Sequence, residues 1–365
     1  MSEIPQMMKG VYLTGFGGFE KLEYREDIPV PTTKPGEVLI KIGAAAVNNT
    51  DVNTRIGWYS KNVKTETNAG GKDGFEDVDK DGSWLGEALH FPRIQGADSC
   101  GRIVAVGEGV DPARIGERVI VRSVQPTPGA PEGSFDCITW GSECDGGFAE
   151  YATALSDEAF KVESDLSDGE LATFPCSYAT ANNLVFRVGV KEGDRVIVTG
   201  ASGGVGSALV QLCHVRGARV YGVCDPGQEE MVKGYGADEI ILRGEDYVER
   251  LGEMSMDVAL DMVAGPQWGQ LLKVLKKGGR YGICGAIAGP MVEFDVRDCY
   301  LKDLSLFGTT YQVRESFEQL VDLVEQGKVK PVVGATFPLK DIVKAQEAFL
   351  SKKYVGKIVL QVAED

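Results

Sequence analysis

The segment Val196-Ile-Val-Thr-Gly-Ala-Ser-Gly-Gly-Val-Gly206 constrains the fold of this chain of 365 residues more than any other. An apolar run typical of a short strand leads through a glycine-rich turn into a helical pattern that we expect to begin near Gly204. Ala201, Gly203 and Gly206 occupy the three positions of a G-x-G-x-x-G pattern, with alanine at the first. A side chain at Gly203 would collide with an incoming pyrophosphate, and one at Gly206 would push the helix off the sheet.

This strand, turn and helix together predict a dinucleotide-binding site. The first turn of the helix offers unpaired N–H donors and the positive end of the helix dipole to phosphate groups. An acidic residue, Asp225, follows 22 residues after Gly203, close to the spacing at which such sites bind the ribose. The residues that we expect to contact the cofactor phosphates are Ala201, Ser202, Gly203, Gly204, Val205 and Gly206.

From about residue 166 the chain alternates between strand and helix patterns. The predicted strands are Arg195–Val198, Arg219–Val223, Glu239–Leu242, Asp257–Met262, Arg280–Gly285 and Ser305–Thr309. The predicted helices are Asp168–Leu184, Gly204–Arg216, Gln228–Tyr235, Asp246–Glu253, Gln267–Lys277 and Arg314–Gln326. Six strands with helices between most of them are typical of a doubly wound parallel sheet, which we place at residues 166–311. The predicted fold class is therefore α/β.

Residues 1–165 are rich in short strand patterns separated by turn residues, which predicts a partly closed, barrel-like module. The predicted strands are Val11–Thr14, Leu22–Tyr24, Glu37–Ile42, Gly101–Val106 and Arg118–Arg122. Residues 61–93 lack a period, and we expect an inserted loop that Trp84, Leu85 and Phe91 partly order. Within it, Asp77-Val-Asp-Lys-Asp-Gly82 begins like a calcium loop, but the closing position is Ala88, which favours a solvated acidic loop.

The net charge limits which partners the protein can bind, and the cysteine pattern indicates the compartment in which it works. The net charge is -16, and such a surface repels nucleic acid and anionic membranes. No apolar run approaches the length of about 18 residues that a membrane span needs, and no secretory signal is visible. The eight cysteines are scattered without a C-x-x-C pair, which indicates free thiols in a reducing cytoplasm. Only two histidines, His90 and His214, are present, which limits the chemistry available to the chain. We favour a surface position for His214 and a loop role for His90 over a catalytic one, which the place of His90 in the insertion leaves open.

The chain resembles the medium-chain dehydrogenase/reductase superfamily nearly from end to end. The segments that carry the resemblance are Gly15-Phe-Gly-Gly-Phe19, Pro35-Gly-Glu-Val-Leu-Ile40, Gln95-Gly-Ala-Asp-Ser-Cys-Gly101, Gly146-Gly-Phe-Ala-Glu-Tyr151, the glycine turn and Gly356-Lys-Ile-Val-Leu360. The resemblance implies a GroES-like, β-rich catalytic domain and a Rossmann domain. It also implies that residues 312–365 return to the catalytic domain.

The zinc-dependent branch of that family binds its catalytic metal through a Cys, a His and a second Cys. Those positions hold Asn48, Ala97 and Cys176 here, and a catalytic zinc needs three protein ligands. Only Cys137 and Cys144 lie in the region that matches the structural zinc lobe, so we expect neither zinc ion. The chain instead resembles the zinc-free quinone oxidoreductase and enone reductase branch, through its segment N-x-x-D-x-x-x-R-x-G-x-Y at Asn48, Asp51, Arg55, Gly57 and Tyr59.

Reduction of a quinone or of an activated C=C bond needs hydrogen-bond donors for the oxygen on which charge develops, but no metal. The resemblance implies that Asn48 and Tyr59 lie near the nicotinamide, with Tyr59 able to donate to the enolate. An aromatic ring packed under a loop is the alternative role for Tyr59. Asp51 is a further candidate, although we favour a structural ion pair with Arg55 over catalysis. Cys176 is expected in the pocket wall.

The residues around the adenosine end decide between NADPH and NAD. Asp225 follows the predicted second strand, where an acid would repel a 2′-phosphate. Arg243 and Lys353 fall where quinone reductases place groups near that phosphate. Thr180 and Gly285 complete the expected cofactor contacts. The resemblance favours NADPH, and the local charge leaves NAD open.

These observations predict a cytoplasmic, NADPH-dependent oxidoreductase that transfers hydride to a small-molecule quinone or α,β-unsaturated carbonyl compound without zinc. Two alternatives remain: a zinc-free alcohol or aldehyde dehydrogenase, and a protein that binds the cofactor without turnover. The resemblance further implies a homodimer formed through the edge of the Rossmann sheet. No nucleic-acid or membrane partner is expected.

Overall fold

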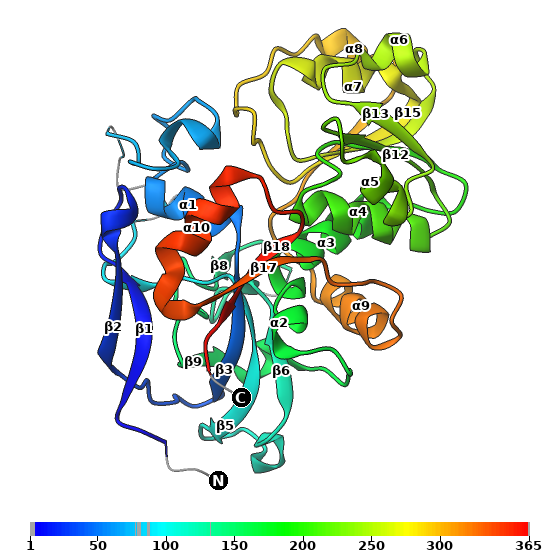
Figure 1. The fold of residues 1–365 in the computed structure, drawn as a ribbon. Helices are drawn as coiled ribbons and strands as arrows, with labels where there is room; N and C mark the ends of the chain where they lie inside the picture. The colour runs from blue at the N-terminus through cyan, green and yellow to red at the C-terminus, as the bar shows by residue number, and fades with distance from the viewer. Residues whose placement is uncertain (1–3, 77, 79–81, 86–87, 132, 364–365) are drawn as a thin grey trace. The chain divides into compact units, whose positions relative to one another are not determined.

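The computed structural model describes residues 4–76, 78, 82–85, 88–131 and 133–363. The chain forms two compact units (Figure 1). The β-rich unit contains residues 1–63, 70–176 and 331–365, and the parallel-sheet unit contains residues 64–69 and 177–330. The units therefore change at 176/177 and 330/331, later in the chain than the domain boundaries expected after 165 and 311. No helix in the described ranges is long and apolar enough to cross a membrane.

The main sheet of the β-rich unit has the strand order β10-β6-β5-β3-β18-β17, and β9 also pairs with β3. Its strands are β3 Glu37–Val47, β5 Asp98–Val106, β6 Arg118–Val121, β9 Tyr151–Leu155, β10 Ala159–Lys161, β17 Val333–Pro338 and β18 Lys357–Gln361. The remaining strands, β1 Met7–Leu13, β2 Leu22–Pro29, β4 Arg93–Ile94, β7 Val124–Pro126 and β8 Cys137–Thr139, form two smaller sheets.

The register around β3 brings together residues that are far apart in the sequence. β3 runs antiparallel to both β5 and β18. Ala46 pairs with Asp98, and Val47 pairs with Ile358. The end of β3 therefore meets the first residues of both neighbouring strands, so that Asn48 follows β3 where Asp98 begins β5 and Lys357 begins β18.

Two helices of the β-rich unit complete this region. Helix α1, Asn49–Ile56, follows β3 directly, and all its residues from Thr50 onward are buried. It ends at Gly57, which adopts the left-handed conformation with φ of 75° that favours glycine. Helix α10, Ile342–Ser351, packs against β17 and β18. Neither helix was predicted from the sequence. For α1 the reason is that its residues are mostly polar, although the helix is buried.

The parallel-sheet unit confirms the predicted doubly wound fold. Its strand order is β13-β12-β11-β14-β15-β16, and every neighbouring pair is parallel. The strands are β11 Arg195–Val198, β12 Arg219–Cys224, β13 Glu239–Leu242, β14 Met256–Asp261, β15 Leu275–Ile283 and β16 Ser305–Gly308. The order reverses between β11 and β14, and ligands of such sheets bind at that switch point, beyond the carboxyl ends of the strands.

The helices of this unit lie close to their predicted positions. They are α3 Ala179–Val188, α4 Gly204–Val215, α5 Glu229–Gly234, α6 Tyr247–Leu251, α7 Trp268–Val274 and α9 Arg314–Glu325. A further short helix, α8 Val296–Tyr300, was not predicted. The single helix predicted over Asp168–Leu184 was wrong. The segment is divided into α2 Asp168–Leu171, a π-helical turn at Phe174–Tyr178 and α3. Pro175 lies in that turn, and proline has no N–H to continue an α-helical ladder.

Trp84 and Phe91, two of the residues expected to order the inserted loop, make aromatic contacts. The ring of Trp84 stacks on Tyr59 with centroids 6.3 Å apart, and Phe91 packs edge-on against Phe16 at 5.1 Å. Asp77 and most of the calcium-like segment that it begins lie outside the described residues. Among the residues that the structure does describe, no group of three or more acidic, His or Cys side chains could hold a metal ion.

Candidate active site

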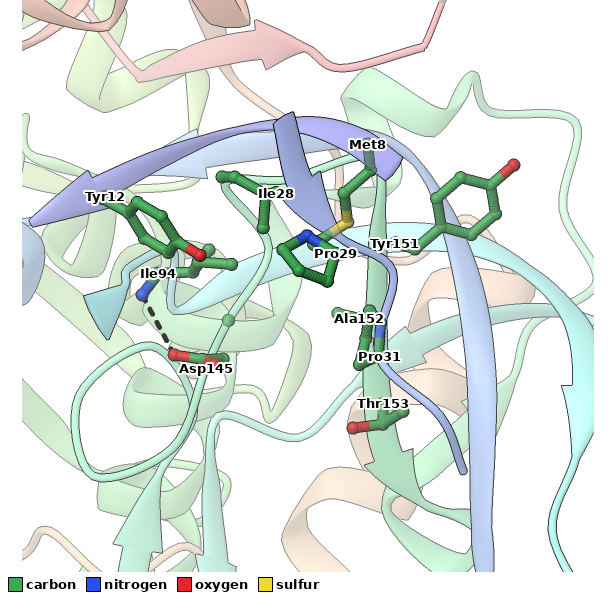
Figure 2. A pocket seen from close by; sticks show the side chains of 11 residues that line it. Met8, Tyr12, Ile28, Pro29, Pro31, Ile94, Asp145, Tyr151, Ala152 and Thr153 are labelled. Carbon is green, nitrogen blue, oxygen red and sulfur yellow. Dashed lines mark hydrogen bonds between the residues drawn. The ribbon is translucent and has the colours of Figure 1, made fainter. Parts of the chain in front are cut away.

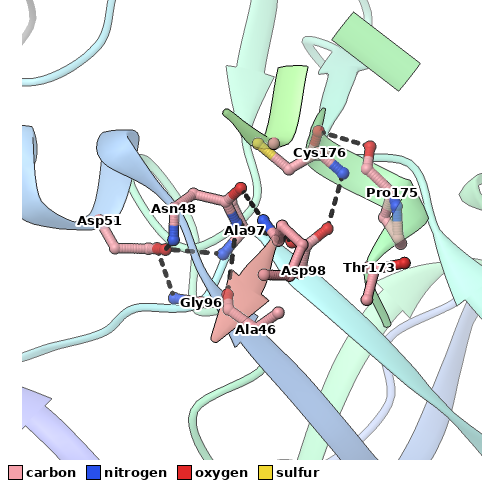
Figure 3. Close-up of polar contacts among 12 residues, drawn as sticks. Ala46, Asn48, Asp51, Gly96, Ala97, Asp98, Thr173, Pro175 and Cys176 are labelled. Atoms are coloured by element: carbon pink, nitrogen blue, oxygen red, sulfur yellow. Dashed lines mark hydrogen bonds and ion pairs between the residues drawn. The ribbon is translucent and has the colours of Figure 1, made fainter. Parts of the chain in front are cut away.

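Five residues come together where β3 ends and where β5 and β18 begin, and we call Asn48, Asp51, Asp98, Cys176 and Lys357 the β3-end cluster. Figure 3 shows the first four of them. All five are buried. They come from four separate stretches of chain that the sheet register and the segment before α3 hold together. Polar groups in such a place need partners, because unpaired buried polar atoms are costly.

The amide of Asn48 is bonded on both sides. Its Nδ2 donates to Asp98 Oδ2 at 2.8 Å and to the carbonyl oxygen of Ala46 at 3.2 Å. Its Oδ1 accepts from the ammonium group of Lys357. Both amide hydrogens therefore have acceptors inside the β-rich unit, and the proposed contact of Asn48 with cofactor or substrate stays a prediction.

Asp98 and Lys357 form a buried ion pair at the centre of the cluster. Lys357 Nζ lies 2.7 Å from Asp98 Oδ2, and the two side chains are 4% and 0% exposed. The second carboxylate oxygen, Asp98 Oδ1, accepts from the backbone N–H of Cys176 at 2.7 Å. The sequence analysis did not select either residue, although both stand inside segments that carry the family resemblance. Asp98 follows Ala97, and Lys357 follows Gly356.

Asp51 caps helix α1 and ties it to the chain before β5. Its Oδ2 accepts from the Asn48 N–H at 2.7 Å, and its Oδ1 accepts from the N–H groups of Gly96 and Ala97, both at 3.2 Å. Burial raises the pKa of Asp51 to about 7, and the nearby carboxylate of Asp98 adds to the shift. Asp51 is thus poised to change charge close to neutral pH.

The predicted ion pair between Asp51 and Arg55 was wrong. Arg55 donates instead to Gln346 Oε1 at 2.9 Å, to the Gly17 carbonyl at 2.9 Å and to the Gly71 carbonyl at 2.7 Å. Although the two residues are one turn apart, the Asp51 carboxylate is held by the N–H groups of Asn48, Gly96 and Ala97. The Arg55 guanidinium near its end binds carbonyl oxygens of neighbouring loops. The buried ion pair of this region is formed by Asp98 and Lys357.

Tyr59 carries a hydroxyl group that faces a second hydroxyl on α1. Its Oη donates to Thr50 Oγ1 at 3.2 Å. Burial of this end of the side chain raises the pKa of Tyr59 to about 12, so the phenol stays protonated at neutral pH. Its ring packs against Trp58 and Trp84, so the alternative packing role is also present in the structure. Thr50 was not among the residues predicted from the sequence, although its position two residues after Asn48 could have indicated that it lies near the site.

The β3-end cluster does not fit a catalytic zinc ion. The amide of Asn48 is fully engaged, and Ala97 has no donor atom. A catalytic zinc ion needs three protein ligands, and a lone cysteine at Cys176 does not supply them. Cys176 would therefore be the single ligand at the three positions that the zinc branch uses.

The glycine turn of the parallel-sheet unit fits a dinucleotide phosphate. A Cβ at Gly206 would lie 1.9 Å from the Gly200 carbonyl oxygen, so α4 can start this close to the turn only with glycine there. A Cβ at Gly203 would meet that oxygen at 3.5 Å and no other described atom within 4 Å, which leaves this side of the turn open. The turn is held to β12 by the bond from the Ala201 N–H to the Val223 carbonyl. The N-terminus of α4 is thereby presented to a phosphate group.

The other expected cofactor residues lie in different surroundings. Asp225, just after β12, forms an ion pair with Arg243 at 3.0 Å, and both side chains are exposed. Gly285 follows β15, and Thr180 is a half-buried residue of α3. All four belong to the parallel-sheet unit, whereas Lys353 is an exposed residue of the β-rich unit. Their predicted contacts with the cofactor stay predictions.

A small hollow in the β-rich unit contains none of the predicted site residues (Figure 2). It is lined by β1, β2 and β9, with Tyr12, Ile28 and Tyr151 among its walls. Asp145 at its rim accepts from the Ile94 N–H at 3.0 Å and pairs with Arg93. These bonds anchor β4, which indicates a structural role for the region.

Comparison with known proteins agrees with this architecture. Residues 34–164 match the alcohol dehydrogenase GroES-like domain, and residues 204–326 match the family described as zinc-binding dehydrogenase. Human quinone oxidoreductase is 29% identical over 97% of this chain and 98% of its own length. Acryloyl-coenzyme A reductase from Metallosphaera sedula is 30% identical over 97% of this chain and 99% of its own. A solved structure of a candidate alcohol dehydrogenase from Sinorhizobium meliloti 1021 is 43% identical, covers 100% of this chain and 99% of its own, and superposes with a TM-score of 0.89.

A GroES-like unit joined to a parallel sheet with a glycine-rich dinucleotide turn defines a class of oxidoreductases. The chain belongs to the medium-chain dehydrogenase/reductase superfamily, in its quinone oxidoreductase and enone reductase branch. The resemblance and the fold class inferred from the sequence are thereby confirmed.

Proposed function

We propose that this protein is an NADPH-dependent reductase that transfers hydride to a quinone or an α,β-unsaturated carbonyl compound without a zinc ion. The observation that carries the proposal is the donor set of the β3-end cluster. An amide bound to an ammonium group and an alanine stand at two of the three positions whose side chains bind the metal in the zinc-dependent branch, and Cys176 alone keeps its ligand atom. Substrates whose own conjugation accepts the electron pair need hydrogen-bond donors rather than a Lewis acid.

The hydroxyl groups of Tyr59 and Thr50 are the proposed donors. When bound, the reduced nicotinamide supplies the hydride. Negative charge then grows on the conjugated oxygen of the substrate, and the Thr50 hydroxyl, which accepts from Tyr59, keeps its own hydrogen to donate. Burial raises the pKa of Tyr59 to about 12, so it holds its proton at neutral pH. Thr50 can pass its proton to the enolate or hydroquinone oxygen and take the Tyr59 proton in exchange, along the hydrogen bond that Tyr59 donates to it.

The preference for NADPH rests on Arg243. Its guanidinium is exposed beside the end of β12, where the ribose of a bound dinucleotide is expected, and a planar guanidinium binds phosphate through two parallel hydrogen bonds. The carboxylate of Asp225 lies 3.0 Å away and would hold this side chain in place. We therefore propose that the pair accepts a 2′-phosphate through Arg243, while Asp225 keeps some affinity for the ribose of NADH.

Turnover assays test the proposal. Purified protein is mixed with NADPH or NADH and with a benzoquinone, an enone, acryloyl-coenzyme A or an aldehyde, and absorbance at the nicotinamide band is followed. Oxidation of NADPH by a quinone or an enone, unchanged after treatment with a chelator, supports the proposal. Turnover confined to the aldehyde or to the reverse reaction with an alcohol would favour a zinc-free alcohol dehydrogenase. Binding of NADPH without any turnover would favour a protein that has lost catalysis.

We also propose a homodimer formed through β16. This strand ends the parallel sheet, so its outer edge has no strand partner among the described residues. Exposed apolar residues lie on β16 and in the segment that precedes it: Met291, Phe294, Val296, Tyr300, Leu301 and Leu306. A second copy could extend the sheet there and cover these side chains. Light scattering should give the mass of two chains, and Leu306→Arg should give that of one.

The proposed location is the cytoplasm, because all eight cysteines are free thiols.

A further inference from the structure

We propose that Lys357 is a positioning residue of the active site, which acts on catalysis through the amide of Asn48. The proposal rests on the proposed reductase function. Lys357 was not among the site residues predicted from the sequence. The proposal is carried by the hydrogen bonds, burial and sheet register of the β3-end cluster. The tests separate a role in positioning from a role in folding alone.

Lys357 and Asp98 determine the orientation of the Asn48 amide. An Asn side chain can present either its oxygen or its NH₂ group to a given neighbour. Lys357 is a pure donor and contacts Oδ1, while Asp98 Oδ2 and the Ala46 carbonyl are pure acceptors and contact Nδ2. Turning the amide over would set its NH₂ group against the ammonium and its oxygen against the carboxylate. Lys357 and Asp98 therefore select one orientation of Asn48.

The ion pair between Lys357 and Asp98 also holds the chain around Asn48 in place. Lys357 and Asp98 begin two strands that flank β3 on opposite sides, so their ion pair bridges the end of the strand that leads into Asn48. Through its other oxygen, Asp98 also binds the backbone of Cys176. One pair of charges thus joins β3, β5, β18 and the π-helical turn before α3.

Helix α1 connects this ion pair to the proposed donors, Thr50 and Tyr59. Thr50 lies two residues after Asn48, in the first turn of α1, and it accepts the hydrogen bond of Tyr59. Catalytic groups must be held within about 0.5 Å of their productive positions. If the bridge is lost, the first turn of α1 can shift while the rest of the fold persists. The chemical step should then slow, whereas the dinucleotide turn in the parallel-sheet unit should keep its affinity for NADPH.

A double-mutant cycle tests whether Lys357 acts through Asn48. The variants are Lys357→Met, Asn48→Ala and the combination, with Lys344→Met as the matched control, since Lys344 is an exposed lysine of α10 paired with Asp341. All are assayed at a temperature well below their unfolding transitions, with NADPH and the best substrate of the wild type. We expect K357M to lower kcat about 100-fold with less than about a threefold change in the NADPH dissociation constant. The double variant should lose little more than N48A alone, because the two residues form one unit.

A second variant keeps the proposal testable if K357M does not fold, because a lone buried carboxylate at Asp98 is strongly destabilising. Lys357→Met combined with Asp98→Asn removes both charges and should recover stability. Under the positioning role its kcat stays at least about 30-fold low, since Asn48 has lost its ammonium donor. Recovery of both stability and kcat in this variant, or additive effects of K357M and N48A, would overturn the proposal. An inactive wild type would instead overturn the proposed reductase function and this inference with it.

Discussion

The hydroxyl group of Tyr59 lies 3.2 Å from that of Thr50, and the tyrosine is the donor. The two side chains stand at the two ends of α1, one within its first turn and one just beyond its last. The aromatic rings of Trp58 and Trp84 hold the phenol in that position. The structure therefore offers a protonated donor and a second hydroxyl next to the β3-end cluster, in a chain with only two histidines.

Replacement of Tyr59 by phenylalanine should lower kcat about 100-fold with an enone substrate, because a positioned general acid contributes about that much or more. The ring and its packing are preserved, so the unfolding temperature should change little. Tyr24→Phe is the control, since that exposed hydroxyl group bonds only weakly to Glu26 at 3.4 Å. A value of kcat for Y59F within twofold of the wild type would assign Tyr59 to packing alone.

Replacement of Arg243 by alanine should raise the Michaelis constant for NADPH at least about tenfold and leave that for NADH nearly unchanged, because a charged hydrogen bond to phosphate is worth about 1.5–3 kcal/mol. Asp225→Asn should shift the preference further toward NADPH, since it removes a negative charge near the 2′ position. Arg219→Ala is a matched control, because Arg219 forms a comparable exposed ion pair with Glu239. Equal losses with both nucleotides would contradict the assignment.

The stability of the protein should depend on Asp51 between pH 4 and 7. Burial raises the pKa of this carboxyl group to about 7 in the folded state, above its ordinary value of 3.8. The folded state therefore binds a proton that the unfolded state has already released. The contribution of Asp51 to the free energy of unfolding falls, by a few kcal/mol at most, as the pH rises from about 4 to about 7, and is constant above that.

Urea unfolding of wild type and Asp51→Asn between pH 5 and 8 measures this effect. The variant should resemble the wild type at low pH, because its neutral amide has nearly the shape of the protonated carboxyl group that the folded state holds there. The wild type alone should lose stability as the pH rises, so the difference between the two proteins should change steadily toward pH 7. A constant difference across this range would show that Asp51 does not titrate there.

Arg122 and Glu158 form a two-point ion pair, with distances of 2.6 and 2.8 Å and exposures of 1% and 6%. Glu158→Gln should lower the free energy of unfolding by about 3–5 kcal/mol, because it leaves a buried guanidinium without its counter-charge. Glu163→Gln disrupts an exposed pair with Lys161 and should leave the free energy of unfolding nearly unchanged. Chemical denaturation gives both values, and similar losses for the two variants would refute the distinction.

Replacement of Gly206 by alanine should abolish measurable NADPH binding and lower stability. The added methyl group would lie 1.9 Å from the Gly200 carbonyl oxygen, so α4 must move away from the turn that we propose to bind phosphate. Gly269→Ala is the control, because a Cβ there meets no described atom within 4 Å and glycine is unfavourable inside a helix. NADPH fluorescence titration measures binding, and unchanged affinity in G206A would place the cofactor elsewhere.

Much of the parallel-sheet unit was predictable because its signals are local. The strand of Arg195–Val198 and the start of α4 at Gly204 lie where the sequence patterns placed them. Apolar runs, helical periodicity and turn glycines each act over a few residues, so a single sequence displays them directly. The division of the segment from 168 to 188 was missed, because Pro175 can be tolerated, kink a helix or end it, and packing decides which.

The sequence by itself determined the fold class, the dinucleotide turn, and the absence of two of the three zinc ligands at the expected positions. Only the tertiary structure decided which charges are partners. Asp51 and Arg55, one helical turn apart, do not pair, whereas Asp98 and Lys357, far apart in the chain, do. The physical reason is that a buried charge is satisfied by whatever the strand register and nearby loops bring within hydrogen-bond distance. That register results from the packing of the whole β-rich unit rather than from any local pattern.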